Sequence, residues 1–481
     1  MMTLLTPSYR PPGLTAARRK TIPIIVVAPK DLAAWKKSQD PLARALLTGQ
    51  RFTGEASQLL LLPPRNPDAA YRCLVGAGDP VDPFALAAAA RQLDAAQTYH
   101  LEPYGQSKTH QQALVVGWSL GCEGYHRKTS PAPAFASLTW PKDCDRAAAS
   151  RLIGGICQTR ALINAPAQEQ SPHDLAQTAR RLAKAFGARI TVWQGRKLDA
   201  AFPALAAVGN TSPRPPRMID LTWGAERTRA PRVTLVGKGV CFDTGGLNLK
   251  PAPAMLLMKK DMGGAAHALG LAAMIMHAKL NLRLRVLIPA ADNVVDGNAM
   301  RPLDIITTRK GLTIEVGHTD AEGRVILADA LAAACEQKPD LLLDFATLTG
   351  AARVALGSEI PALFSNDEKL AREMLKNSRQ TGDPLWQLPL YGPYARHIKA
   401  TPADITNASR NPFGGAIEAA LFLKAFVDPA IAWAHLDMMA YTIDSRPGRP
   451  RGGEAMGLRT CFALLAARYG TRARPRGRSD R

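Results

Sequence analysis

The sequence of 481 residues lacks any uninterrupted apolar run long enough to cross a membrane. A membrane helix needs about 18 such residues or more, whereas the apolar run at residues 24–27 has the length of a strand. Internal repeats are also missing, so we expect neither a membrane-spanning protein nor a repeat array. The hydrophobic fraction of 46% and the charged fraction of 21% are ordinary for a globular protein, and the length predicts two domains.

Paired cysteines are missing as well. The chain has an odd number of cysteines and no CxxC spacing, which excludes a disulfide framework and a cysteine-rich structural zinc site. Scattered thiols fit a reducing compartment, so we predict a cytoplasmic protein. The seven cysteines stand at positions 73, 122, 144, 157, 241, 335 and 461.

Acidic residues are scarce relative to basic ones. Against 61 Lys and Arg the chain has 40 Asp and Glu, which gives a formal net charge of +21. Such a surface attracts nucleic acid, anionic membranes and acidic partners without sequence specificity. The arginine-rich tail at about 468–481 is predicted to be disordered. We attribute the charge to solubility or compositional bias, with weak nucleic-acid binding through the basic surface as an alternative.

Residues 21–140 alternate short apolar runs with helical stretches such as residues 84–95. This alternation predicts a small α/β domain. Three prolines at residues 131–141 indicate a linker, so we place the N-terminal domain at residues 1–142, with the linker at its end. The first 30 residues contain no acid and faintly resemble a transit peptide, but we interpret them as the start of this domain. The strand-sized apolar runs lie at residues 24–27, 59–62, 73–75 and 114–116.

Residues 143–481 form the second predicted domain, which begins with a connecting helix at about 145–163. Apolar strands flanked by helices predict a fold of the α/β class, in which a central mixed β-sheet is covered by helices on both faces. In such sheets chemistry gathers at the strand ends. We expect strands at 233–236, 283–289, 313–316, 341–345 and 431–436, and helices at 263–279, 324–336, 368–379 and 417–426.

Two segments of this domain concentrate carboxylates and lysines. The first reads VGKGVCFDTGGLNLK over residues 236–250 and continues to Asp261, which immediately precedes a helical stretch. In it, Lys238 lies at the exit of an apolar strand, and Asp243 precedes a Gly-Gly turn that lets the backbone approach a ligand closely. The second reads HTDAEGR over residues 318–324. If that segment is extended, its Asp, Glu and Arg side chains all face one side.

Four carboxylates, from Asp243, Asp261, Asp320 and Glu322, cannot share one pocket bare, because like charges a few ångströms apart would keep some of them protonated. Divalent cations resolve that conflict. Oxygen-rich ligation suits Mg²⁺ and Mn²⁺, and Zn²⁺ also accepts it. Two ions about 3.5–4 Å apart could share a bridging water and make it a nucleophile near neutral pH.

Each of these residues also has a purely structural interpretation. Thr319 and Glu322 have the spacing of a capping box, and Asp261 could be a simple helix N-cap. Lys238 and Lys250 could be solvated surface lysines. Taken together these interpretations weaken, because capping needs neither a Gly-Gly turn nor a lysine at the exit of an apolar strand.

The motifs strongly resemble those of the leucyl aminopeptidase family of cytosolic metallopeptidases. That family carries a VGKGxxFDxGGxxxK run, then DMGGAA, NTDAEGR and DxATLTGA. This chain has the first at residues 236–250, the second at 261–266, TDAEGR at 319–324, and Asp344 with ATLTGA at 346–351. The likeness covers at least residues 160–457, including GGAI at 414–417 and WAHLD at 433–437.

The resemblance implies a role for each motif. A lysine ligand must be a neutral amine, so Lys238 would need a depressed pKa, which burial beside a dication supplies. Lys250 would stay charged and polarise the scissile carbonyl. Arg324, near a helix N-terminus that favours anions, would hold a bicarbonate acting as general base. The implied metal ligands are Lys238, Asp243, Asp261, Asp320 and Glu322, and the implied pocket for the N-terminal side chain is lined by Met258, Thr347 and Gly350.

The resemblance therefore predicts an aminopeptidase that releases Leu-like or other apolar N-terminal residues from short peptides. It implies two divalent ions per subunit, Mn²⁺ or Zn²⁺ foremost, with Mg²⁺ or Co²⁺ as alternatives, and a homo-hexamer. Three departures stand out. His318 replaces the usual Asn, Leu256 replaces a commonly acidic residue, and the basic tail is an addition. None of them removes a ligand or a catalytic residue.

A serine hydrolase is the competing interpretation. GWSLG at residues 117–121 matches the GxSxG pattern after an apolar run, as a nucleophile elbow requires, with Ser119 as the nucleophile. The pattern is short, and the required acid and histidine would have to come from later in the chain. His267 and His435 are candidates, but the context of each favours a structural residue.

Overall fold

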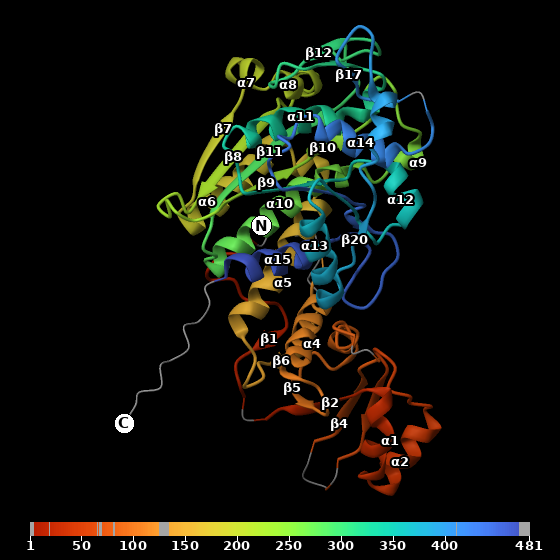
Figure 1. Ribbon diagram of the computed structural model, residues 1–481. Coiled ribbons are helices and arrows are strands. Elements are labelled where there is room, and N and C mark those ends of the chain that lie inside the picture. Colours follow the sequence, from red (N-terminus) through yellow and green to blue (C-terminus); the bar gives the residue numbers. More distant parts are fainter. Residues whose placement is uncertain are drawn as a thin grey trace. The chain divides into compact units, whose positions relative to one another are not determined.

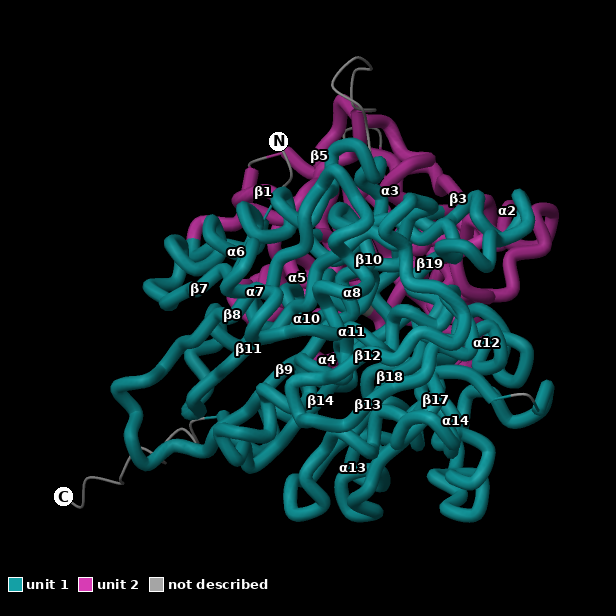
Figure 2. The backbone as a smooth tube through the Cα atoms, turned by 90° about the horizontal axis from the view of Figure 1, so that it is seen from above, with its two compact units in different colours: residues 1–7, 158–441, 452–481 teal, residues 8–157, 442–451 magenta. Residues whose placement is uncertain are grey.

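The computed structural model describes residues 4–470 except 19, 65, 67–69, 80–81, 125–133 and 410. The predicted linker lies partly, and the basic tail mostly, outside the described residues. The chain divides into two compact units (Figure 2): the smaller comprises Ser8–Cys157 and Thr442–Arg451, and the larger comprises Met1–Pro7, Gln158–Tyr441 and Gly452–Arg481. The sequence-based boundary between residues 142 and 143 stays a prediction. In the described part of the chain, no helix is long and apolar enough to span a membrane.

The smaller unit contains a six-stranded sheet that is parallel except for one antiparallel edge strand. Along β2, Ile24 and Val26 pack on one side, while Ile25 and Val27 join a second core around Trp35. Both faces are therefore buried, which explains the continuous apolar run. The strand order is β1 (Leu14–Thr15), β6 (Ser137–Thr139), β5 (Thr98–Pro103), β2 (Ile22–Val27), β4 (Arg72–Gly76) and β3 (Leu59–Leu62), and the helices are α1 (Pro29–Lys37), α2 (Pro41–Gly49), α3 (Ala89–Gln92) and α4 (Lys108–Gly121).

Two predictions for this unit are wrong. The apolar run at residues 114–116 is not a strand but the buried middle of α4, a helix whose first turn is capped by Ser107 through the backbone N–H of His110. A run of three apolar residues has no periodicity that separates a strand from a buried helix. The helix expected at residues 84–95 is reduced to α3, because turns occupy residues 83–88.

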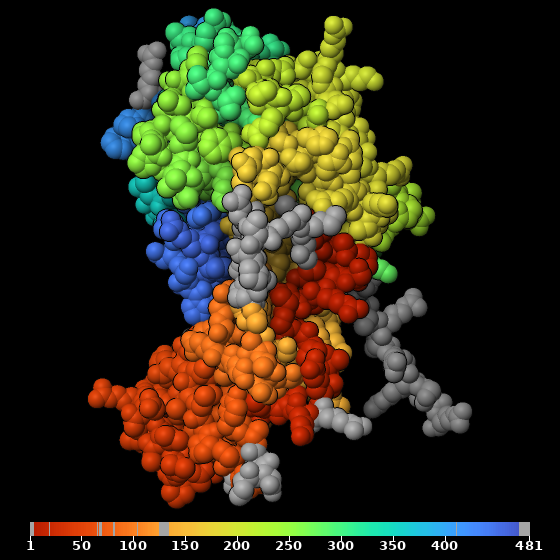
Figure 3. Space-filling view, turned by 180° about the vertical axis from the view of Figure 1, so that it is seen from behind, coloured from red at the N-terminus to blue at the C-terminus, as the bar shows by residue number. Residues whose placement is uncertain are grey.

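The larger unit is built on a nine-stranded sheet. Its mixed character confirms the predicted fold. The order is β16 (Trp386–Gln387), β15 (Ala362–Ser365), β18 (Trp433–Asp437), β14 (Leu341–Ala346), β9 (Arg232–Gly237), β11 (Arg283–Asn293), β8 (Arg217–Trp223) and β7 (Arg189–Trp193), with β10 (Gly239–Asp243) also paired to β11. The central strands β18, β14, β9 and β11 are mutually parallel where they pair. The strands β7 and β8 run antiparallel to their neighbours, and β15 runs antiparallel to β18 but parallel to β16. The half-exposed edge strand β7 lies in the yellow part of the surface (Figure 3).

Helices cover both faces of this sheet (Figure 1). On one face α10 (Gly263–Ala278) packs on β9 and β14, and on the other α11 (Glu322–Cys335) packs on β9 and β11. Alanine and glycine let α10 be buried along nearly its whole length, as a helix without a polar face must be. The further α-helices are α5 (Arg146–Asn164), α6 (Pro172–Phe186), α7 (Arg196–Ala201), α8 (Pro203–Gly209), α9 (Ala252–Met255), α12 (Gly350–Leu356), α13 (Glu368–Thr381), α14 (Gly415–Lys424) and α15 (Leu458–Tyr469).

The expected strand at residues 313–316 exists as β13 (Thr313–Glu315), but it belongs to a separate three-stranded sheet with β12 (Ile305–Thr307) and β17 (Ile405–Thr406). A further two-stranded sheet pairs β19 (Tyr441–Thr442) with β20 (Gly452–Gly453). Short 3₁₀ turns complete the described elements: η1 (Ala167–Glu169), η2 (Met258–Met262), η3 (Thr319–Ala321) and η4 (Gly392–Ile398).

Candidate metal and catalytic site

The parallel strands deliver the motif residues to one edge of the large sheet. Lys238 follows β9 directly, Asp243 is the last residue of β10, and Thr347 follows β14. The helix α10 begins against these strand ends, because the backbone N–H of Ala265 donates to the carbonyl of Lys238 at 2.8 Å. Gly264 makes this approach possible, since a Cβ there would stand 2.0 Å from the Phe345 carbonyl oxygen. The carboxyl edge of the sheet is where ligand sites of such folds occur.

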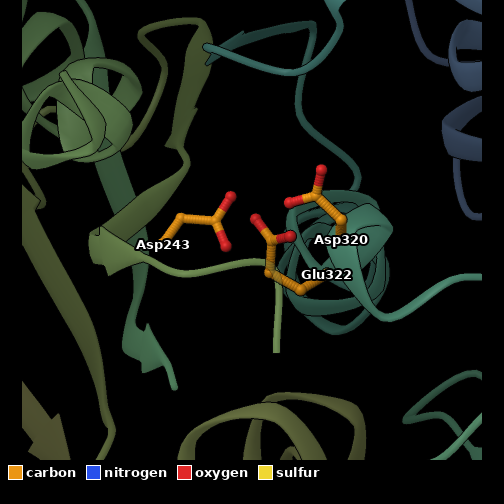
Figure 4. Close-up of side chains that lie close together, drawn as sticks. All are labelled: Asp243, Asp320 and Glu322. Atoms are coloured by element: carbon orange, nitrogen blue, oxygen red, sulfur yellow. The ribbon is translucent and has the colours of Figure 1, made fainter. Parts of the chain in front are cut away.

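Three carboxylates converge at this edge (Figure 4). Oxygens of Asp243, Asp320 and Glu322 all lie within 4.8 Å of one another. The ammonium of Lys238 bridges Asp261 Oδ2 at 2.7 Å and Glu322 Oε1 at 2.9 Å. The ammonium of Lys250 lies 2.9 Å from Asp243 Oδ2 and also pairs with Asp320. The four carboxylates and two lysines thus form one ionic cluster.

The second motif is not extended, contrary to the geometry considered from its sequence. Residues 319–321 form the turn η3 and Glu322 opens α11, so the two acids converge through a helical turn instead of an alternating strand. Gly323 leaves room for the neighbouring lysine, because a Cβ there would lie 2.5 Å from Lys238 Cε. The glycine of TDAEGR is therefore required by packing against Lys238.

The structural interpretations of these residues are wrong. Thr319 Oγ1 donates to the Gly245 carbonyl at 2.6 Å and makes no capping box with Glu322. Asp261 does not cap α10, which has Met262 at its N-cap position. Lys238 and Lys250 are not solvated, since their side chains are 3% and 12% exposed.

Two neutral side chains orient the acids, and sequence reasoning missed one of them. Asn293, at the end of β11, donates from Nδ2 to Asp243 Oδ1 at 2.8 Å and to Glu322 Oε2 at 3.3 Å. Thr347 Oγ1 donates to Asp261 Oδ1 at 2.6 Å. Nothing in the sequence indicated that Asn293 faces residues 50 and 29 positions away.

The two lysines of the cluster do not balance the charge of its four carboxylates. Burial and the nearby Asp261 raise the pKa of Asp243 to about 6, and burial and the charge of Asp243 raise the pKa of Glu322 to about 8. Ionised groups deprived of water and surrounded by like charges favour protonation. Clustered carboxylates that cannot all be ionised on their own are stabilised in the ionised form by divalent cations, which prefer oxygen ligands. The residues present therefore fit a metal site.

Lys238 differs from its expected state in this ion-free cluster. Burial alone would lower its pKa, but the charges of Asp261, Glu322 and Asp243 outweigh burial and raise the pKa above its usual range. The lowered pKa predicted for Lys238 requires a dication beside the amine, and it stays a prediction.

The cluster opens into a cavity of about 740 Å³, which we call the site cavity. Arg324 reaches it from α11, with Nη1 donating to the Asn407 carbonyl at 2.7 Å and Nε without a partner among the described residues. Sequence reasoning passed over two further cations of the lining, Lys260 and Arg353. Of the predicted site residues, Lys238, Asp243, Lys250, Met258, Asp261, Asp320, Arg324, Thr347 and Gly350 line this cavity, and Glu322 lies behind it in the cluster.

The serine hydrolase interpretation fails on geometry. Ser119 lies inside α4 and is fully buried, with its hydroxyl donating to the Pro12 carbonyl at 2.7 Å. A nucleophile elbow needs an exposed serine on a strand-to-helix turn. His267 is a structural residue as predicted, because Nδ1 contacts the Gly263 carbonyl and Nε2 accepts from the Met456 backbone N–H.

Comparison with protein families agrees with this geometry. A model described as "Cytosol aminopeptidase family, catalytic domain" matches residues 157–462, and "M17 aminopeptidase, N-terminal domain" matches residues 22–141. The chain belongs to the cytosol aminopeptidase family. This confirms the predicted relationship, and the catalytic-domain match contains the whole site cavity.

Several proteins resemble the chain in sequence or structure. A probable cytosol aminopeptidase of Chlorobaculum tepidum is 42% identical over 328 residues, which cover 67% of this chain but only 64% of that protein. The crystal structure of the cytosol aminopeptidase from Coxiella burnetii superposes with a TM-score of 0.89 at 42% identity, covering 95% of this chain and 99% of that one. The bottromycin maturation enzyme BotP in complex with Mn has a TM-score of 0.84 at 33% identity, covering 93% and 99%.

Proposed function

We propose that this cytosol aminopeptidase family member is a metal-dependent aminopeptidase that removes N-terminal residues from short peptides. The observation that carries the proposal is the charge-deficient cluster of four buried or half-buried carboxylates and two lysines beside a cavity. Family membership and the Mn bound by BotP support it. The sequence-based choice of Mn²⁺ or Zn²⁺, with Mg²⁺ or Co²⁺ as alternatives, is part of the proposal.

Asp243, Asp261, Asp320, Glu322 and Lys238 are the residues that would hold the metals. A pair of divalent ions there would supply a water that is nucleophilic near neutral pH. Asn293 and Thr347 fix the orientation of the carboxylates through the hydrogen bonds described above. Preorganised ligands of this kind lose little freedom when they bind a cation.

Lys250 and Arg324 are the proposed catalytic residues. The Lys250 ammonium lies at the cavity wall, where it can polarise the scissile carbonyl and stabilise the developing oxyanion. Arg324 has an unpartnered Nε among the described residues and lies in the first turn of α11, a position that favours an anion. Arg324 would hold a bicarbonate there, and that group would supply a general base.

The test is metal reconstitution with a leucine chromogenic amide. We expect the metal-stripped protein to be inactive and to regain activity with Mn²⁺, Zn²⁺, Mg²⁺ or Co²⁺, whereas Glu322→Ala stays inactive with all four. Glu336→Ala is the matched control, because Glu336 lies at the far end of α11 and its side chain accepts hydrogen bonds from Arg309. Activity that survives exhaustive chelation would contradict the proposal.

Other parts of the prediction rest on the resemblance alone. A homo-hexamer and the preference for Leu-like residues are proposals of this kind, whereas the proposed cytoplasmic location also rests on the scattered cysteines. Weak nucleic-acid binding through the basic surface stays a prediction from the net charge of +21.

A further inference from the structure

One wall of the site cavity carries a buried cation that the proposed mechanism does not use. Lys260 lies in η2 between Met258 and Asp261, and its side chain is almost entirely buried, with the residue 1% exposed. It lines the same cavity as Met258, Thr347 and Gly350, the predicted lining for the N-terminal side chain. Lys260 is therefore placed where it can contact that side chain.

The Lys260 ammonium has no partner. Its Nζ makes no hydrogen bond and no ion pair with any described residue. The adjacent Asp261 is already engaged by Lys238 and Thr347, and the nearby Asp437 accepts from the backbone and hydroxyl of Thr349 and from Leu348 N–H. A buried charge without a partner is costly to maintain, so this ammonium is suited to donate hydrogen bonds to an anion.

A second cation lies near the first. Arg353, on α12, also lines the site cavity, and among the described residues it makes no ion pair. Its Nη2 would be 3.6 Å from a Cβ at Gly350, so the guanidinium lies beside the glycine of the predicted pocket. Burial and the repulsion between the charges of Arg353 and Lys260 lower the pKa of Lys260 to about 7. An anion between them would relieve that repulsion.

We propose that Lys260, with Arg353 beside it, binds the carboxylate side chain of an N-terminal Asp or Glu, so that the enzyme prefers acidic over apolar N-terminal residues. This inference rests on the proposed aminopeptidase function and replaces the Leu-like preference implied by the resemblance. The C-terminal carboxylate of a dipeptide offers the same chemistry, but we assign the site to the N-terminal side chain because the cations lie beside Met258 and Gly350.

The experiment compares kcat/KM for the p-nitroanilides of Glu, Gln and Leu with the metal-loaded enzyme. These amides lack a C-terminal carboxylate, and Glu and Gln differ only in charge. We expect Glu to exceed Gln by about tenfold or more, since a site built for one polar partner discriminates against its neutral analogue by at least that factor. Lys260→Met should reverse the Glu:Gln ratio and raise kcat/KM for Leu, and Lys260→Arg should retain the preference for Glu.

Lys259→Met is the matched control. Lys259 is the preceding residue, but its ammonium donates to the Asn164 carbonyl at 2.6 Å and does not line the site cavity. This variant loses the same charge and should keep the Glu:Gln ratio of the parent within about twofold.

The outcomes separate this inference from the proposed function. Hydrolysis of Leu and Gln amides with no preference for Glu, or a Glu:Gln ratio that Lys260→Met leaves unchanged, overturns the inference and leaves the aminopeptidase standing. A preference for Glu-containing dipeptides that depends only on their free C-terminus also overturns it. Failure to hydrolyse any substrate with any metal overturns both. If Lys260→Met does not fold, the parent ratio and Lys260→Arg still decide.

Discussion

At the scale of single residues, Lys250 carries the clearest expectation. Its ammonium is held by Asp243 and Asp320 at the cavity wall, where substrate carbonyl oxygen would develop charge. Lys250→Met removes that positive charge while keeping the aliphatic stem. We expect kcat to fall by about 10²–10³-fold, the loss typical of a removed oxyanion donor, with a smaller change in KM.

Steady-state kinetics on the preferred amide, with bound metal measured in parallel, check this expectation. The metal content should stay close to that of the parent, because Lys250 is not a proposed ligand. A variant that retains more than half of the parent kcat with full metal content would rule out the proposed role of Lys250.

His435 gives a prediction for stability against pH. Burial would lower its pKa, but the neighbouring Asp344, whose Oδ1 lies 2.5 Å from Nδ1, outweighs burial and raises the pKa above its usual value. A raised folded-state pKa stabilises the protein below the unfolded value of about 6.5, and that contribution is lost as the pH rises through the folded-state pKa. The free energy of unfolding of the parent, measured with urea, should therefore fall above pH 6.5, and the His435→Gln variant should lack this fall. If the free energies of unfolding of the parent and the variant change with pH in the same way, His435 does not cause the pH dependence.

The residue types of the site could be predicted from the sequence, but their mutual contacts could not. The motifs identified Asp243, Asp261, Asp320 and Glu322 as a group, because four carboxylates cannot all be ionised in one pocket unless cations are present. The position of Lys260 was not predicted, because two adjacent lysines in a sequence usually indicate side chains that are exposed to solvent. Only the fold shows that Lys259 bonds to Asn164, whereas Lys260 lines the site cavity with an Nζ that has no partner among the described residues.

At the scale of secondary-structure elements, glycines decide how closely helices approach the strands. Gly323→Ala should drive the new methyl into Lys238, because the ideal Cβ position lies 2.5 Å from Cε of that lysine. Overpacking in a buried site costs about 1–3 kcal/mol. We expect thermal unfolding at a lower temperature and weaker Mn²⁺ binding, since the displaced amine is a proposed ligand.

Gly297→Ala is the control for this change. No atom lies within 4 Å of a Cβ at Gly297, so the substitution adds a methyl in open space. Calorimetry of both variants with and without Mn²⁺ separates a local clash from a general effect of replacing glycine. Equal behaviour of the two variants would contradict the packing role of Gly323.

Long apolar or alternating segments were predictable at this scale, and short ones were not. The strands β9, β14 and β18 and the helices α10, α11 and α13 appear close to where their patterns place them. The run at residues 114–116 was too short to reveal its helix, and residues 320–324 were misjudged as potentially extended. In both places the local composition does not specify the conformation, because it depends on the neighbouring turns of the same helix.

At the scale of the whole molecule, the sequence predicted a mixed sheet with helices on both faces but not the order of its strands. Pairs such as β9 with β14 join residues about a hundred positions apart, and no local pattern specifies such partners. The antiparallel strands β7 and β8 at one edge were not anticipated. Their alternating, partly polar sequences lack the continuous apolar run of a central strand.

The ionic cluster couples the stability of the whole molecule to metal binding. In the ion-free state burial and neighbouring acids raise the pKa of Glu322 to about 8, so this carboxyl favours the folded state less as the pH rises from its unfolded value of about 4.5 towards 8. Glu322→Gln imitates the protonated acid at every pH. We therefore expect the metal-stripped variant to be at least as stable as the metal-stripped parent at pH 8.

Added Mn²⁺ should reverse that order. A ligand that binds only the folded state stabilises it by about 2.7 kcal/mol at a hundred times its Kd, and Glu322→Gln removes one of the anionic ligands that create the affinity. Thermal unfolding at pH 8 should show a Tm that rises with Mn²⁺ in the parent and hardly moves in the variant. A variant that is less stable than the parent without metal, yet gains as much from Mn²⁺, would mean that Glu322 serves packing and not metal binding.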